Sequence, residues 1–178
     1  QQPLNNFYRT FKGIKTISWS SSEWLLGGVD RTYSKGIITI GSTLNDLSNH
    51  QQTLSNFQDI TTSSWSNELN KWLIGGYTSN YNGNYNGRIA IGSTIQDLSN
   101  NQQELSNFDE IYTASWSKEY GKWLIAGVGT KNISIGSTNQ ELNDTNNQKK
   151  INTKFGFSIT ISSWSSQRGE WLIATQAE

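Results

Sequence analysis

The sequence predicts an all-β protein, built as a β-propeller-like array of four-stranded antiparallel sheets. Three observations predict this class: a phrase with two tryptophans recurs four times, β-branched and aromatic segments flank each copy, and glycines close several of these segments. The first tryptophans of successive copies are separated by 46, 51 and 48 residues. They are Trp19, Trp65, Trp116 and Trp164. We therefore expect about 3.5 to 4 repeats of about 48 residues in one repeat domain, residues 1–178.

Each copy is expected to contain three clear strands, and the second copy illustrates them. Residues 60–65 are β-branched and end in an aromatic residue. Residues 71–74 form a short apolar run closed by two glycines, and residues 89–91 alternate before Gly92. Short segments of this kind, bounded by turn residues, are typical of strands in a packed sheet.

A weaker fourth strand is predicted at the segment Leu-Ser-Asn-Phe, residues 54–57. Related segments lie at 105–108, 4–7 and 151–155. With this segment as the first strand, the repeat units span approximately residues 4–53, 54–104, 105–150 and 151–178. The last unit is incomplete, because the strand corresponding to 89–91 is missing from it. Its final apolar run, residues 171–173, is therefore expected to form an exposed sheet edge.

A short helical turn is expected after the third strand of each unit. An acidic residue follows a threonine by three positions, which is the spacing of a capping box, and a leucine comes next. The acidic residues are Asp46, Asp97 and Glu141. Because equivalent carboxylates would lie one blade apart in a ring, we interpret them as helix caps. They are not spaced as a catalytic pair, and weak Ca²⁺ binding is the alternative.

The tryptophan pair is predicted to form the main apolar surface between units. One small sheet cannot bury both of its faces alone, so equivalent contacts must recur where one unit meets the next. Each tryptophan buries up to about 150–250 Å², and at about 25 cal/mol/Å² a pair contributes several kcal/mol. The predicted structural core consists of Trp19, Trp24, Trp65, Trp72, Trp116, Trp123, Trp164 and Trp171.

The order of these segments resembles the Asp-box or BNR-like β-propeller repeats of sialidase-like and photosystem-assembly-type proteins. The shared order is S-W-S, turn, W-L-I-G-G, loop and I-x-I-G-S-T, and it spans nearly the whole chain. The turn itself differs, because GSTLNDLSN, GSTIQDLSN and GSTNQELND replace the family's S-x-D-x-G-x-T-W. The resemblance therefore implies a propeller without an active site. Since most propellers have four to eight blades, the chain forms four small blades, part of a larger ring, or a partial ring that associates with others.

Composition excludes several classes of partner. The net charge is zero and only 16% of residues are charged, so neither nucleic acid nor an anionic lipid surface is an expected partner. No apolar run approaches the roughly 20 residues of a membrane span. The chain contains no cysteine, which excludes thiolate metal sites, and we expect no metal or other cofactor. Because the chain lacks methionine and begins with Gln1, it is expected to be a processed or excised product.

No residue pattern predicts catalysis, so we expect a protein that is not an enzyme. The single histidine, His50, occupies the loop position that Asn101 fills in the next copy. A sialidase needs clustered arginines, whereas the arginines here occupy non-equivalent positions of the repeat. These are Arg9, Arg31, Arg88 and Arg168. Metalloprotease, phosphate-loop, dinucleotide and nucleophile-elbow motifs are also missing from the sequence.

The loop between the second and third strands varies most among the copies. In the second copy, residues 77–88 place three tyrosines among asparagines and glycines, a composition typical of recognition surfaces. The candidate ligand-binding residues are Tyr33, Tyr77, Tyr81, Tyr85 and Arg88. The alternative is a long solvated hairpin whose tyrosines pack on one another.

These observations predict a non-enzymatic structural or interaction module of an extracellular, cell-surface or virion assembly. It would act through inter-blade loops and an exposed sheet edge, with protein partners or by self-assembly. The second hypothesis is a glycan-binding lectin that uses the tyrosine- and asparagine-rich loops. The third is a degenerate sialidase-like glycosidase.

Overall fold

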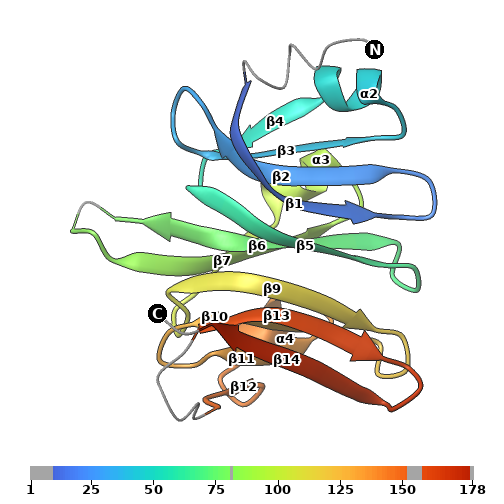
Figure 1. Ribbon diagram of the computed structural model, residues 1–178. Coiled ribbons are helices and arrows are strands. Elements are labelled where there is room, and N and C mark those ends of the chain that lie inside the picture. Colours follow the sequence, from blue (N-terminus) through green and yellow to red (C-terminus); the bar gives the residue numbers. More distant parts are fainter. Residues whose placement is uncertain (1–9, 81, 152–157, 177–178) are drawn as a thin grey trace.

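The protein consists of four antiparallel sheets that follow one another along the chain (Figure 1). The computed structural model describes residues 10–80, 82–151 and 158–176. Sheet 1 contains β1 (Phe11–Trp19), β2 (Trp24–Asp30), β3 (Gly36–Gly41) and β4 (Gln51–Leu54). Sheet 2 contains β5 (Asp59–Ser66), β6 (Lys71–Ser79), β7 (Tyr85–Gly92) and β8 (Gln102–Leu105). Sheet 3 contains β9 (Glu110–Ser117), β10 (Lys122–Val128), β11 (Ile133–Gly136) and β12 (Gln148–Lys149). Sheet 4 contains β13 (Ser158–Ser165) and β14 (Glu170–Gln176).

The all-β class and the antiparallel pairing are confirmed, but the predicted fourth strand is displaced. Residues 51–54, and not 54–57, pair with β3 as the last strand of sheet 1. Leu54 ends the strand, and the N–H of Phe57 turns back to donate to the Leu54 carbonyl at 3.1 Å. Residues 105–108 repeat this arrangement. Segment 4–7 and all of 151–155 except Ile151 lie outside the described residues.

Short helices follow the third strands of sheets 1, 2 and 3, as the capping pattern predicts. They are α2 (Leu44–Asn49), α3 (Ile95–Asn100) and α4 (Asn139–Asn143). In α2 and α3 the capping box is complete. In α4 the Thr138 hydroxyl accepts from the Glu141 N–H, but the longer Glu141 side chain reaches one residue further and accepts from the Ser137 N–H at 2.8 Å. Hydrogen bonds lower the pKa of each acidic side chain. The largest cause is the side-chain bond with Thr43 for Asp46, the side-chain bond with Ser93 for Asp97, and the Ser137 N–H for Glu141.

A bulge interrupts the first strand of every sheet at the same place in the repeat. In sheet 2 it lies between Ile60 and Thr62, and it brings the chain against the second glycine of the Gly-Gly pair on β6. A Cβ on Gly76 would lie 2.0 Å from the Asp59 carbonyl oxygen. Gly28 and Gly127 face the same contact with the carbonyl oxygens of Gly13 and Glu110. The close approach of two backbones explains the glycine at this position in sheets 1, 2 and 3.

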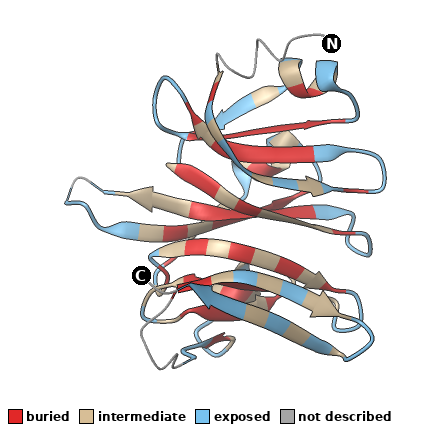
Figure 2. Cartoon of the chain, viewed as in Figure 1, coloured by how far each residue is buried: buried red, intermediate tan, exposed pale blue. Residues whose placement is uncertain are grey.

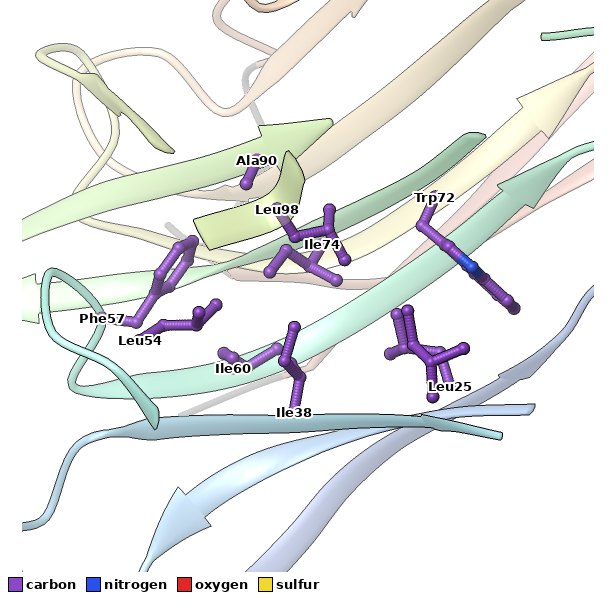
Figure 3. Packing of buried hydrophobic residues seen from close by; sticks show 10 residues of the cluster. Leu25, Ile38, Leu54, Phe57, Ile60, Trp72, Ile74, Ala90 and Leu98 are labelled. Carbon is purple, nitrogen blue, oxygen red and sulfur yellow. The ribbon is translucent and has the colours of Figure 1, made fainter. Parts of the chain in front are cut away.

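The sheets stack face to face in chain order, and apolar clusters fill each junction (Figure 1). Between sheets 1 and 2, Leu25 and Ile38 pack against Ile60, Trp72 and Ile74 (Figure 3). Equivalent clusters join sheet 2 to sheet 3 and sheet 3 to sheet 4. Sheets 2 and 3 are therefore buried on both faces, which explains why β6 and β10 have continuous apolar runs. Figure 2 shows these buried layers and the more exposed β13 and β14.

Each tryptophan pair is a cross-strand pair inside one sheet, and its second member enters the junction with the preceding sheet. Ring centroids in the four pairs are 4.6–4.7 Å apart. Trp72 and Trp123 are buried, with 1% and 0% of their surface exposed. Trp65, Trp116, Trp164 and Trp171 are half-buried. The expectation of a core tryptophan does not hold for sheet 1, where Trp19 and Trp24 are 46% and 40% exposed. No described sheet precedes sheet 1, so nothing of the stack covers them.

Sheets 1 and 4 are the two ends of the stack (Figure 1). Across each junction, the first strands lie side by side: β1 with β5, β5 with β9, and β9 with β13. Among the described residues the stack does not close into a barrel or a ring. Within the described part of sheet 4, β14 pairs only with β13, so its other edge is open.

Candidate functional site

Two tyrosines of the β6–β7 hairpin, Tyr77 and Tyr85, form an aromatic contact. Tyr77 and Tyr85 lie on neighbouring strands, and their rings contact edge to face with centroids 5.2 Å apart. In the sheet register, Tyr77 is the partner of Asp59 on β5. Burial, followed by the nearby carboxylates of Asp59 and Glu110 and by Tyr85, raises the pKa of the Tyr77 phenol to about 12. Tyr77 is therefore a neutral hydrogen-bonding group at physiological pH.

A cavity of about 350 Å³ lies beside Tyr77. Residues of both sheets line it: Lys12, Gly13, Lys15, Val29, Ser34, Gln58, Asp59 and Tyr77. Asp59 is 8% exposed, and its Oδ1 atom is buried without a hydrogen-bond partner. Burial raises the pKa of the Asp59 carboxyl, and the charges of Lys15 and Lys12 with the Ile60 N–H oppose this shift. An unpartnered buried carboxylate oxygen is a strong acceptor for a ligand that carries hydroxyl or amino groups.

The cavity depends on a difference between copies. The position that holds Asp59 in sheet 2 holds Glu110 in sheet 3 and Gly13 in sheet 1. A Cβ on Gly13 would meet nothing within 4 Å, so the absence of a side chain there leaves space at the cavity wall. Burial also raises the pKa of Glu110, and a hydrogen bond with the Tyr112 side chain opposes this shift. The charge of Asp59 also raises the pKa of Glu110, after burial and the charge of Asp109.

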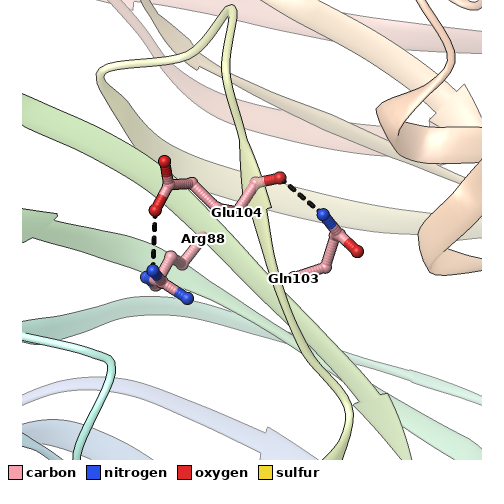
Figure 4. Close-up of polar contacts among 3 residues, drawn as sticks. All are labelled: Arg88, Gln103 and Glu104. Carbon is pink, nitrogen blue, oxygen red and sulfur yellow. Dashed lines mark hydrogen bonds and ion pairs between the residues drawn. The ribbon is translucent and has the colours of Figure 1, made fainter.

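The structure places the other predicted ligand-binding residues apart from this cavity. Tyr33 is 74% exposed on the turn between β2 and β3, where its backbone N–H donates to Asp30 Oδ1 at 2.7 Å. Arg88 donates from Nη2 to Glu104 Oε2 at 2.7 Å on β8, next to a bond from Gln103 to the Glu104 carbonyl (Figure 4). Tyr81 lies outside the described residues. Of the five candidates, the structure therefore brings together Tyr77 and Tyr85.

The sequence analysis missed Lys12, Lys15 and Asp59. A signal for Asp59 exists, because an acidic residue stands directly before the buried Ile60, where sheet 1 has glycine and sheet 4 has Ser158. Lys15 is the bulge residue of β1, and only knowledge of the bulge places it next to sheet 2. His50 lies at the C-cap of α2, where its N–H donates to the Asp46 carbonyl at 2.9 Å.

Among the described residues, no group of at least three histidine, cysteine, aspartate or glutamate side chains is arranged to hold a metal ion. None of the described helices has the length and hydropathy needed to cross a membrane. Comparison with models of known protein families finds no match to this chain, and comparison with curated proteins finds none either.

Proposed function

We propose that the chain is a non-enzymatic interaction module with a propeller-type arrangement of sheets, and that it assembles with other protein surfaces through its two open ends. The side-by-side first strands and the face-to-face sheets support the propeller arrangement, which the Asp-box resemblance also implies. We extend to this proposal the extracellular, cell-surface or virion setting that the resemblance suggests.

One observation carries the proposal: leucines at one repeat position are buried everywhere except at the end of the stack. Leu25, Leu73 and Leu124 are 0%, 0% and 3% exposed, because the next sheet covers each of them. The equivalent Leu172 in sheet 4 is 73% exposed. Large exposed apolar side chains on one face mark a surface that binds another protein. In the part of the chain that the structure describes, β14 pairs only with β13, and its other edge adds a row of backbone groups available for pairing to this end.

Light scattering coupled to size-exclusion chromatography tests this proposal on the whole chain. We expect a species at least twice the 20.0 kDa chain mass, with a fraction that rises with protein concentration. A monomer at every concentration, with no capture by a surface that presents the chain itself, would contradict assembly through the open ends.

The arginines give no support to the glycosidase hypothesis. Arg88 pairs with Glu104, and Arg168 pairs with Glu170 at 3.4 Å on an exposed hairpin. Neither pairing presents a free cluster of guanidinium groups to a carboxylate ligand. Catalysis is therefore not part of the proposed function.

Glycan binding is the second candidate, and the cavity beside Tyr77 favours it. A buried acceptor oxygen on Asp59 next to an aromatic ring can bind a sugar hydroxyl and the apolar face of a sugar. On a glycan array, Asp59→Asn and Tyr77→Ala should each weaken binding at least about tenfold. Glu110→Gln changes the equivalent carboxylate outside the cavity lining and should bind normally. An array without any signal for the wild type would exclude this candidate.

A further inference from the structure

The two ends of the stack carry matching substitutions in a pair of side chains that bridges neighbouring sheets at two of the three internal junctions. Between sheets 1 and 2, Thr16 Oγ1 and Ser63 Oγ are hydrogen-bonded at 2.8 Å. Between sheets 3 and 4, Thr113 Oγ1 and Ser162 Oγ are bonded at the same distance. In the repeat, the threonine position belongs to the face that meets the next sheet, and the serine position belongs to the face that meets the preceding one.

At each end of the stack, an isoleucine replaces the member of this pair that lies on the outer face. On sheet 4, Ile161 occupies the threonine position and is 62% exposed. On sheet 1, Ile17 occupies the serine position and is 60% exposed. A polar group opposite either isoleucine would be buried without a partner, whereas isoleucine opposite isoleucine buries apolar surface on both sides. The outer faces therefore match each other better than either matches an internal face that carries the threonine–serine pair; between sheets 2 and 3, Ala114 occupies the serine position.

The rest of each outer face exposes part of one half of a junction, although on sheet 1 the side chains Phe11, Leu26 and Ile37 are already buried in a cluster with Leu47. On sheet 1, Ile14 and Trp24 are 48% and 40% exposed. Their equivalents Ile60 and Trp72 are 0% and 1% exposed, because sheet 1 covers them. On sheet 4, the exposed Leu172 corresponds to Leu25, which packs into that same cluster. Each end thus keeps the side chains that a neighbouring sheet buries inside the chain.

The turns between the first and second strands of each sheet carry side chains that contact the next sheet's tryptophans, and these positions are also complementary between the two ends. The indole Nε1 of Trp116 donates to Glu68 Oε2 on the preceding sheet at 2.6 Å, and Trp164 donates to Glu119 in the same way. Gln167 occupies the corresponding position on sheet 4, and its amide oxygen can accept from Trp19. Next to Glu119, Tyr120 stacks on Trp171 with centroids 5.5 Å apart. The corresponding residue on sheet 4 is Arg168, which suits a tryptophan face through a cation–π contact.

We infer that the outer face of sheet 1 in one copy packs on the outer face of sheet 4 in a second copy of this chain, as neighbouring sheets pack inside the chain. The inference rests on the proposed function and names its partner. A second copy is required because the two faces lie at opposite ends of the stack (Figure 1). The contact is head to tail, so it forms a ring if the rotation closes and a filament if it does not. Two copies joined at both ends hold eight sheets, the upper end of the common range for propellers.

Cysteine cross-linking tests the contact, and the absence of native cysteines makes the readout specific. We would prepare Ile17→Cys and Ile161→Cys as separate variants, mix them in equal amounts, oxidise them and separate them on a non-reducing gel. The mixture should yield a species of twice the chain mass, and either variant alone should yield at most one tenth as much. Thr113→Cys combined with Ser162→Cys is the positive control, because these side chains meet inside one chain. Leu44→Cys mixed with Ile161→Cys controls for random collision, since Leu44 is exposed on α2.

Three results would overturn the inference. The first is no cross-link in the mixture under conditions that oxidise the positive control. The second is equal cross-linking by Ile17→Cys alone, which indicates a contact between like faces. The third is a disulfide within a monomer when both cysteines are on one chain, which indicates that the chain closes on itself.

A charge substitution separates this inference from the broader proposal. Ile161→Asp should raise the dissociation constant of the assembly at least about tenfold, because it buries a carboxylate against Ile17. Leu44→Asp alters a side chain of similar exposure and should leave assembly unchanged. Both variants should keep the melting temperature of the wild-type monomer. If the wild type assembles but Ile161→Asp assembles equally well, the head-to-tail contact is wrong and the proposed function stands. If the wild type does not assemble at all, the proposed function itself fails.

Discussion

Replacing Gly76 with alanine should destabilise the protein far more than replacing its neighbour Gly75. A Cβ on Gly76 would lie 2.0 Å from the carbonyl oxygen of Asp59 and 3.1 Å from the Cα of Ile60. Both atoms belong to the backbone of β5, so no side-chain rotation can relieve the clash. A Cβ on Gly75 would instead lie 2.8 Å from the Cγ2 of Ile111, a side-chain atom.

The size of the expected destabilisation follows from the backbone movement that Gly76→Ala requires. To restore an ordinary separation of about 3.4 Å, β5 and β6 must separate by more than 1 Å at the bulge, which breaks neighbouring ladder hydrogen bonds. We expect Gly76→Ala to lower the free energy of unfolding by about 3–5 kcal/mol. Alanine stands at the Gly75 position in sheets 3 and 4, as Ala126 and Ala174. Gly75→Ala should therefore change stability by about 1 kcal/mol or less, since the loss of unfolded-state entropy offsets part of the repacking.

Urea denaturation monitored by tryptophan fluorescence measures both changes, and thermal melts should show a drop of about 10 °C for Gly76→Ala. Sheet 4 carries Thr175 at the equivalent position. Among the described residues β14 has no third strand beside it, so it is free to move away from β13. A Gly76→Ala variant within about 1 kcal/mol of the wild type, or equal losses in both variants, would refute the reasoning from backbone contact.

Three further predictions concern charge and burial. The caps lower the pKa of Asp46 and Asp97, so their stabilising effect is present above the ordinary value of 3.8 and is lost as the pH falls through the lowered pKa. Asp46→Asn with Asp97→Asn should lose stability at neutral pH and show a smaller loss on acidification, measured by urea denaturation across pH. Burial raises the pKa of Asp59, so its carboxyl favours the folded state below 3.8 and this advantage is lost as the pH rises through the raised pKa. Asp59→Asn should therefore gain stability relative to the wild type at neutral pH and lose that gain in acid. Trp72→Ala should cost about 3–5 kcal/mol, whereas Trp24→Ala, at a 40% exposed position, should cost less than about 2 kcal/mol in the monomer, by the same denaturation assay.

The repeat, the strands around the tryptophans and the helix caps could be predicted because each follows from local sequence. The Thr-x-x-Asp spacing specifies the caps of α2 and α3 directly. The fourth strands of sheets 1 and 2 lie three residues before the predicted segments, for a physical reason. Of the residues in β4, only Leu54 is buried, and an edge strand with one apolar residue gives no alternating pattern. Phe57 is buried too, but it covers a junction from a loop.

The candidate site was harder to predict because it depends on contacts between copies. Tyr77 and Tyr85 are visible as a cluster of tyrosines in one loop. Asp59 lines a cavity that is also bordered by sheet 1, where Gly13 leaves space. Neither property is encoded in the local pattern around residue 59. Arg88 shows the converse, since a loop arginine that looks available from sequence is paired with Glu104 on the next strand.

The stack also explains why assembly and the stability of sheet 4 are coupled. In an array where each unit contacts only its neighbours, stability is a sum of terms for the units and for the junctions between them. Sheets 2 and 3 each have two junctions, but sheet 4 has one junction and only two described strands. Its outer residues Ile161 and Leu172 gain burial only when another surface covers them. If a second surface associates at this face, as proposed, it stabilises sheet 4, and a variant that weakens sheet 4 then also weakens the assembly by linkage.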